Sequence, residues 1–211
     1  VYNLARMNML MHNVDYKYID IRNDDTLEHP QHKDLTFDAI VANPPFSAAW
    51  RPDRLSEDDR FSGYGKTAPK GKADFAFVQH MIASMADGGS SRMAVVLPQG
   101  ALLRTGAEAG IRRRILEQDY VEAVIGLAPN LFYGAGLAAS VLVLRQRKSQ
   151  QQKGRVLFID ASRLFRAERA QNFLDSEHGE QVVKWFQDFE DVEHRARVVT
   201  VDEINAEVKA K

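Results

Sequence analysis

The run Phe37-Asp38-Ala39-Ile40-Val41-Ala42-Asn43-Pro44-Pro45-Phe46 decides the fold of this chain. Its first six residues are mainly apolar and predict a short apolar strand. Asn43 and the two prolines then end that strand, because proline lacks a backbone N–H and fixes its own φ angle. Ligands of open α/β sheets bind beyond the carboxyl ends of the strands, so residues 43–46 stand where a site is expected.

These four residues have the chemistry to recognise a planar amino group. The Asn43 side chain offers one oxygen acceptor, and the Pro44 carbonyl offers a second acceptor on a stiff turn. Two acceptors grip an amino group and favour its pyramidal, more nucleophilic form. Phe46 supplies a flat face for a base, a contact worth about 1–3 kcal/mol. The alternative is a turn that only ends a strand, but chance gives this tetrapeptide to roughly one chain of this length in a thousand.

Strands and helices alternate along the chain. Strands are expected at residues 16–21, 37–42, 92–97, 121–125, 139–144 and 156–160. Helices are expected at residues 1–13, 73–86, 106–118, 177–190 and 201–209. This order predicts an open, mostly parallel α/β sheet. The strands at 121–125 and 139–144 have no helix between them, so we expect an antiparallel pair. The long polar loop over 47–72 is of a length that is usually functional or mobile.

Composition excludes several classes of protein. The 211 residues carry 28 Lys and Arg against 29 Asp and Glu, which argues against a strongly basic DNA-coating protein. The absence of Cys excludes disulfide frameworks and Cys-ligated zinc. No apolar run approaches the roughly 20 residues of a membrane span, and residues 1–6 are not a signal peptide. We therefore expect a cytoplasmic protein with no membrane partner. His29 and His32 lack a third ligand, so no metal is expected.

The tetrapeptide Asn43–Phe46 resembles the catalytic motif of amino-group methyltransferases that use S-adenosylmethionine. Further segments make the chain similar to the modification (M) subunit of type I restriction–modification enzymes. The segments that carry this likeness are Phe37–Ser47, Lys72–Phe77, Met93–Pro98, Val124–Leu127 and Asn130–Gly134. The likeness covers about residues 1–165. It implies a Rossmann-like methyltransferase sheet, mostly parallel with an antiparallel hairpin and lacking its first strands.

The resemblance also implies an activity. Its members methylate the exocyclic amino group of adenine in double-stranded DNA, in a complex with a DNA specificity subunit and a restriction subunit. Asn43 and Pro44 would hold the amino group and Phe46 would stack on the base. The base must be flipped out of the duplex, at a cost of a few kcal/mol. Methyl transfer would be a direct in-line displacement that relies on positioning and needs no metal or covalent nucleophile.

Three more residues gain roles from the resemblance. Asp25 matches the position at which a carboxylate accepts a hydrogen bond from the adenine of the cofactor, and Asn43 also belongs to the cofactor site. The alternative for Asp25 is an acidic turn residue. Phe132 and Tyr133 lie where related enzymes pack an aromatic ring against the flipped base, with a core or lid aromatic as the equal alternative.

Lysines in the long loop are candidates for contacts with DNA phosphates. They are Lys66, Lys70 and Lys72, and a solvated loop explains them equally well. We divide the chain into a partial catalytic domain, 1–160, and a small helical C-terminal extension, 161–211.

The Gly-rich cofactor loop of the family does not precede Asp25 in this sequence. We therefore expect this chain alone neither to bind S-adenosylmethionine tightly nor to methylate. Without the first two strands of the fold, we expect residues 16–21 and 37–42 to pair directly, or another chain to fill the gap. The second arrangement would make a homo-oligomer through exposed sheet edges.

Two other interpretations stay open. The first is a methyltransferase acting on RNA guanine or on a protein glutamine amide, although the similar tetrapeptide in those families usually ends in Tyr. Phe46 and the long loop that follows it favour DNA adenine instead. The second is a non-catalytic interaction module.

Overall fold

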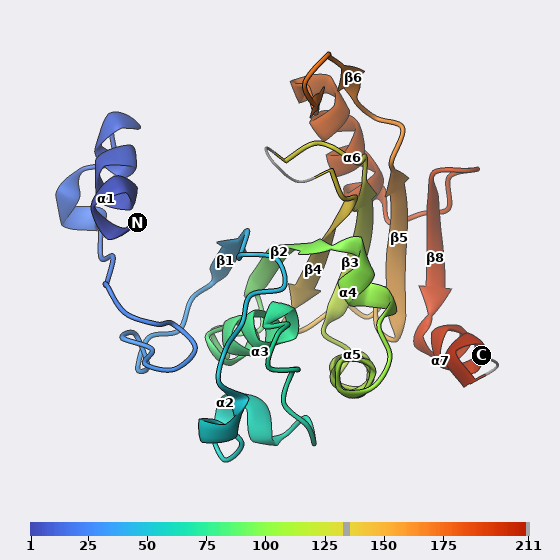
Figure 1. Ribbon diagram of the computed structural model, residues 1–211. Helices are drawn as coiled ribbons and strands as arrows, with labels where there is room; N and C mark the ends of the chain where they lie inside the picture. Colours follow the sequence, from blue (N-terminus) through green and yellow to red (C-terminus); the bar gives the residue numbers. More distant parts are fainter. Residues whose placement is uncertain (133–135, 210–211) are drawn as a thin grey trace. The chain divides into compact units, whose positions relative to one another are not determined.

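The computed structural model describes residues 1–132 and 136–209 (Figure 1). The chain divides into two compact units, Val1–Leu35 and Thr36–Lys211. The functional division at residue 160 stays a prediction.

The first unit contains helix α1 (Tyr2–Met11) and the short 3-10 helix η1 (Tyr16–Tyr18). The strand predicted over 16–21 is therefore wrong. The Asp15 carboxylate caps η1 by accepting a backbone N–H, and both tyrosines of the turn are exposed. The apolar alternation that suggested a strand is local, and a strand also needs a neighbour to satisfy its backbone groups. The predicted direct pairing with residues 37–42 does not form, because there is no strand at 16–21.

The second unit is built on a six-stranded mixed sheet with the order β1-β2-β4-β3-β5-β8. Its strands are β1 (Ala39–Ala42), β2 (Arg92–Pro98), β3 (Val121–Leu127), β4 (Ala139–Arg145), β5 (Arg155–Ala161) and β8 (Ala196–Thr200). Strands β1, β2, β3 and β5 run in one direction, and β4 and β8 run in the other. The predicted α/β class and the antiparallel β3–β4 hairpin are confirmed.

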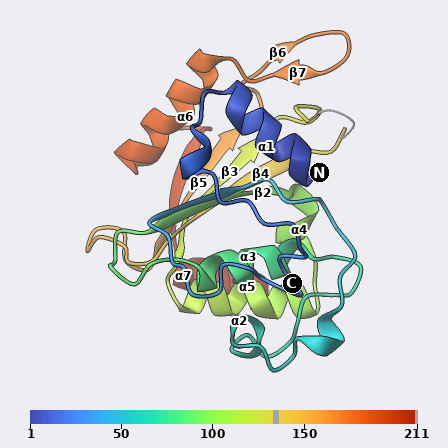
Figure 2. The same ribbon diagram turned by 90° about the vertical axis from the view of Figure 1, so that its left-hand side faces the viewer.

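Helices cover both faces of this sheet (Figure 2). They are α3 (Asp74–Ala83), α4 (Gln99–Leu103), α5 (Ala107–Glu117), α6 (Ser176–Asp188) and α7 (Val201–Lys209). Helix α6 lies on one face, whereas α3, α5 and α7 lie on the other. The C-terminal extension has its two predicted helices and also supplies β8, which the sequence analysis did not identify. Among the described residues, no helix is long and apolar enough to cross a membrane.

Smaller elements complete the unit. They are η2 (Pro52–Arg54), α2 (Asp59–Ser62) and the two-stranded ribbon of β6 (Arg166–Ala167) and β7 (Asn172–Phe173).

The two-residue period of the strands divides the core between the two faces. On β5, Leu157 and Ile159 belong to the apolar cluster that α6 covers with Trp185 and Phe186. The intervening Val156 and Phe158 face the side of α5 and α7. Helices on both faces let a strand bury side chains on either side, and on β5 the adjacent Val156 and Leu157 are both fully buried.

The edge of β1 is open. Among the described residues β1 pairs only with β2, and the Val41 side chain is 84% exposed. Backbone groups on an unpaired edge offer hydrogen bonds to another strand.

We predict that Leu157→Ala lowers the free energy of unfolding by about 2–5 kcal/mol, because it opens a cavity at a fully buried position of β5. Urea unfolding followed by circular dichroism measures the change. The matched control is Leu103→Ala, whose side chain is 75% exposed and whose loss should cost less than about 0.5 kcal/mol. Equal losses in the two variants would contradict the assigned core.

Candidate active site

The carboxyl ends of β1, β2 and β3 meet at one edge of the sheet, since these strands run in the same direction. Asn43 follows β1, α4 follows β2, and the segment with Phe132 follows β3. The rings of Phe46 and Phe132 touch edge to face, with centroids 6.2 Å apart and planes at 74°. Two of the predicted base-packing residues, distant in sequence, therefore share one place.

The Asn43–Phe46 turn presents its polar residue outward. Asn43 is exposed, whereas Pro44 and Phe46 are half-buried, and no peptide bond of the turn is cis. Phe132 also packs against the apolar cluster under α6, so its ring is part of the core margin as well as a neighbour of Phe46. Tyr133 lies outside the described residues.

The loop after this turn folds back on itself and packs. Its base closes where the backbone N–H of Ala73 donates to the carbonyl of Ala48 over 2.9 Å. Trp50 donates its indole N–H to the carbonyl of Pro69, and its ring contacts the Phe61 ring with centroids 5.4 Å apart. Both rings are buried. The long loop is thus packed against itself like an Ω-loop, and its two ends lie together beside the turn.

Asp74 and Arg104 lie behind the turn, and the sequence analysis gave neither of them a role. Asp74 accepts the backbone N–H of Ser47 over 2.8 Å, and Arg104 bonds both residues. The one available signal was an acidic residue at the start of the mainly apolar helix α3. Nothing local marks Arg104, because its partners are distant in sequence.

Asp25, in the first unit, caps a turn. Its Oδ1 accepts the backbone N–H groups of Leu27 and Glu28, each over 2.9 Å. The neighbouring Asp24 accepts the N–H of Asp25 and the side-chain amide of Gln31. The turn interpretation of Asp25 is therefore present in the structure, and its exposed carboxylate keeps Oδ2 for another donor.

The three candidate lysines of the loop are exposed. Lys66, Lys70 and Lys72 form no ion pair with any described residue. Their ammonium groups are thus available to an anion in solution.

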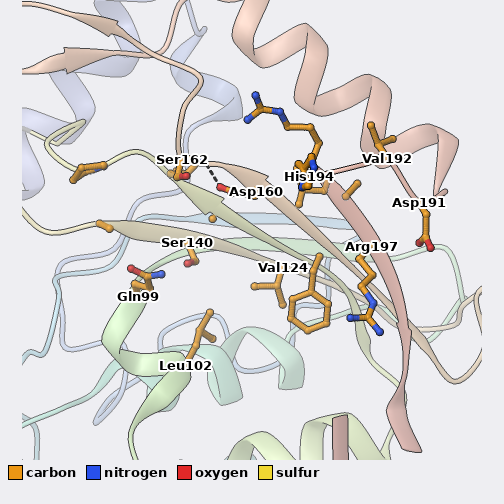
Figure 3. Close-up of a pocket in the computed structure, with 18 of the residues that line it drawn as sticks. Gln99, Leu102, Val124, Ser140, Asp160, Ser162, Asp191, Val192, His194 and Arg197 are labelled. Carbon is orange, nitrogen blue, oxygen red and sulfur yellow. Dashed lines mark hydrogen bonds between the residues drawn. The ribbon is translucent and has the colours of Figure 1, made fainter. Parts of the chain in front are cut away.

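A cavity of about 930 Å³ opens on the sheet between α4 and β8 (Figure 3). Leu102 and Val124 give it an apolar part, and Asp160 and His194 lie in the polar part. None of the predicted site residues that the structure describes lines this cavity. In the described ranges, no three His, Cys, Asp or Glu side chains gather as a metal site does.

Comparison with known proteins identifies the chain. The family model "N-6 DNA Methylase" matches residues 1–209. The chain belongs to this family. The resemblance drawn from the sequence is therefore confirmed, and residues 43–46 stand at the sheet edge described above.

Two curated relatives of the chain are methylase subunits of type I restriction enzymes. The chain is 38% identical, over 96% of its length, to the type I restriction enzyme MpnII methylase subunit of Mycoplasma pneumoniae. It is 35% identical, again over 96%, to the MjaIX methylase subunit of Methanocaldococcus jannaschii. These alignments cover 39% and 38% of the two relatives, so the chain spans less than half of their length.

A solved structure shares the fold of this chain. It is the type I restriction-modification system methyltransferase subunit of Streptococcus thermophilus, at 36% identity and a TM-score of 0.91. The match covers 99% of this chain and 44% of that one.

His80 on α3 anchors the packed loop in a pH-dependent way. Arg60 donates to Nδ1 of His80 over 3.0 Å, which requires that nitrogen to be unprotonated. Burial, and then the charge of Arg60, lower the pKa of His80 from 6.5 to about 4. The unfolded chain therefore takes up this proton at a higher pH than the folded chain. The contribution of His80 to stability is therefore present above pH 6.5 and is lost as the pH falls toward 4.

We predict that His80→Gln removes about 1–2 kcal/mol of the stability loss that the protein shows between pH 6.5 and 4.5. Urea unfolding at both pH values measures this difference. The control His12→Gln alters an exposed imidazole and should keep the pH dependence of the original protein. A pH dependence that is unchanged in His80→Gln would contradict the lowered pKa.

Proposed function

We propose that the protein to which this chain belongs transfers a methyl group from S-adenosylmethionine to the exocyclic amino group of adenine in DNA. The observation that carries this proposal is the exposed Asn43 on a proline-stiffened turn, with Phe46 against Phe132 beside it. Two oxygen acceptors next to an aromatic ring suit a flat base that bears an N–H₂ group. The family and the methylase names of the relatives support the same chemistry.

The residues of this chain fit part of a cofactor site. Asp25 has an exposed carboxylate oxygen that can accept from the amino group of a nucleoside, and Asn43 has a side-chain amide at the sheet edge. When bound, S-adenosylmethionine supplies an electrophilic methyl group on a positively charged sulfur. We assign Asp25, in the first unit, to its adenine, and Asn43, in the second unit, also to cofactor binding.

The turn performs the orientation step. Asn43 Oδ1 and the Pro44 carbonyl accept the two N–H groups of the target amine and direct its lone pair along the line of transfer. As the new N–C bond forms and the C–S bond breaks, positive charge develops on the amine. The two oxygen dipoles stabilise that charge until one amine proton leaves to solvent. Phe46 holds the plane of the base during this displacement.

We propose that the long loop and the partner subunits bind the DNA duplex. A base inside a duplex hides its amino group, so the adenine must be flipped out. We propose that the exposed Lys66, Lys70 and Lys72 bind phosphates, and these contacts would weaken as salt rises. We propose a specificity subunit and a restriction subunit as partners, and the cytoplasm, where the DNA is accessible, as the location. The open edge of β1 takes a further strand from the rest of the protein or from a second copy.

We predict that Asn43→Ala lowers kcat for methyl transfer by about 100-fold or more, because it removes one acceptor for the developing charge. The full-length subunit with its specificity subunit is supplied with radiolabelled S-adenosylmethionine and with duplex DNA, RNA or protein. Counts in the duplex DNA alone support the proposal, and counts in RNA or protein alone favour the alternative substrates. The control Asn205→Ala, on α7, should keep the rate. No transfer to any substrate would contradict the enzymatic proposal.

We predict that Phe46→Ala reduces the population of flipped base by about 5- to 150-fold, the equivalent of about 1–3 kcal/mol of stacking. The fluorescence of 2-aminopurine at the target position of a recognised duplex reports flipping. Phe46→Tyr keeps the ring and should retain most of the signal. A fluorescence response that Phe46→Ala leaves intact would exclude this ring as the stacking partner.

A further inference from the structure

A buried charge cluster supports the Asn43–Phe46 turn from behind. We define it as Ser47, Asp74, Arg104 and Glu108. The Arg104 guanidinium donates to Asp74 Oδ2 over 2.7 Å, to Glu108 Oε1 over 3.0 Å and to Ser47 Oγ over 3.0 Å. Asp74 Oδ1 in turn accepts the Ser47 backbone N–H over 2.8 Å. The cluster thus joins the turn to α3 and to the start of α5.

Because these charges are buried, each needs a bonded partner inside the protein. Asp74 is fully buried and Glu108 is 2% exposed, so both carboxylates depend on the one guanidinium. Burial lowers the pKa of Arg104, but its bonds to Asp74 and Glu108 outweigh this and raise it above the ordinary value. Arg112 donates to the carbonyls of Ala101 and Arg104, which fixes the backbone that carries the guanidinium.

Ser47 connects these charged side chains to the turn. It follows Phe46 directly and has a φ of +51°, in the left-handed region that side chains other than glycine rarely adopt. That conformation costs about 1 kcal/mol or more and persists only where surrounding bonds demand it. The Ser47 backbone N–H donates to Asp74 and the Ser47 hydroxyl accepts from Arg104, and these two bonds meet that demand.

We propose that Asp74 and Arg104 are positioning residues, which act through Ser47 to set the direction in which Asn43 and Phe46 face the target base. This inference rests on the proposed function. Neither residue touches the base, so the cluster governs the rate of transfer rather than the affinity for DNA. Asp74→Asn is the sharpest probe, because an amide cannot accept from Ser47 and from Arg104 at once without turning its N–H₂ toward one of them.

The experiment uses the full-length subunit assembled with its specificity subunit. We expect Asp74→Asn to lower kcat by about 10- to 100-fold, with KM for the duplex changed less than about threefold, as loss of orientation requires. Ser47→Gly keeps the backbone N–H and suits the left-handed φ, so it should retain at least about half of kcat. A large fall in kcat for Ser47→Gly, or a kcat for Asp74→Asn within about twofold of the original, overturns the proposal.

Glu122→Gln is the matched control. Glu122 is also fully buried and pairs with Arg92 over two bonds of 3.0 Å, but it lies at the amino end of β3, away from the turn. Its amide variant should lose stability while kcat stays within about twofold. If Glu122→Gln lowers kcat as much as Asp74→Asn does, the effect is one of general stability and the inference fails.

Hydrogen exchange separates this inference from the proposed function. The Ser47 amide should exchange at least about 10-fold faster in Asp74→Asn than in the original protein, and Glu122→Gln should leave it unchanged. This readout needs no methyl transfer. If the original complex proves inactive on DNA, the proposed function fails, and unchanged exchange in Asp74→Asn then rejects the positioning role as well. Faster exchange together with an unchanged kcat also rejects it.

Discussion

The shared direction of β1, β2, β3 and β5 is the constraint on which the site depends. Parallel strands bring their carboxyl ends to one edge, and the chain leaves that edge after each of them. This geometry brings Phe46, after β1, into contact with Phe132, after β3, although the two residues are 86 positions apart in the sequence. The antiparallel β4 between β2 and β3 is what keeps those two strands aligned.

Rigidity at this edge comes from the chain itself. Two prolines remove backbone freedom on one side of Phe46, and Ser47 in the left-handed region fixes the other side. The packed loop closes immediately beyond, where Ala73 bonds Ala48. An amine acceptor gains from such stiffness because its lone pair must already point along the line of transfer. Ser47, one of several non-glycine residues with a positive φ, therefore lies where the proposed chemistry needs direction.

Local patterns predicted the parts that local forces build. The apolar run before Asn43 and the prolines after it specify where a strand ends, and the tetrapeptide indicated the family. The strand itself also needs its pairing with β2. The strand expected over 16–21 failed because alternation alone provides no partner for its backbone. Arg104 escaped notice for the opposite reason. Its role exists only through Ser47 and Asp74, which folding brings to it from other elements.

Charged side chains, rather than an apolar contact, support the turn because hydrogen bonds fix the orientation of Ser47. Burying Asp74 and Glu108 costs desolvation, and well-packed apolar side chains can match the stability of a buried pair. Apolar packing, however, offers no acceptor for the Ser47 N–H and no preferred angle. The Arg104 guanidinium bonds both carboxylates and the Ser47 hydroxyl at once, so turning the fork away would break these bonds. Because Ser47 is bonded to Asp74 and Arg104, these two residues set the orientation of the turn.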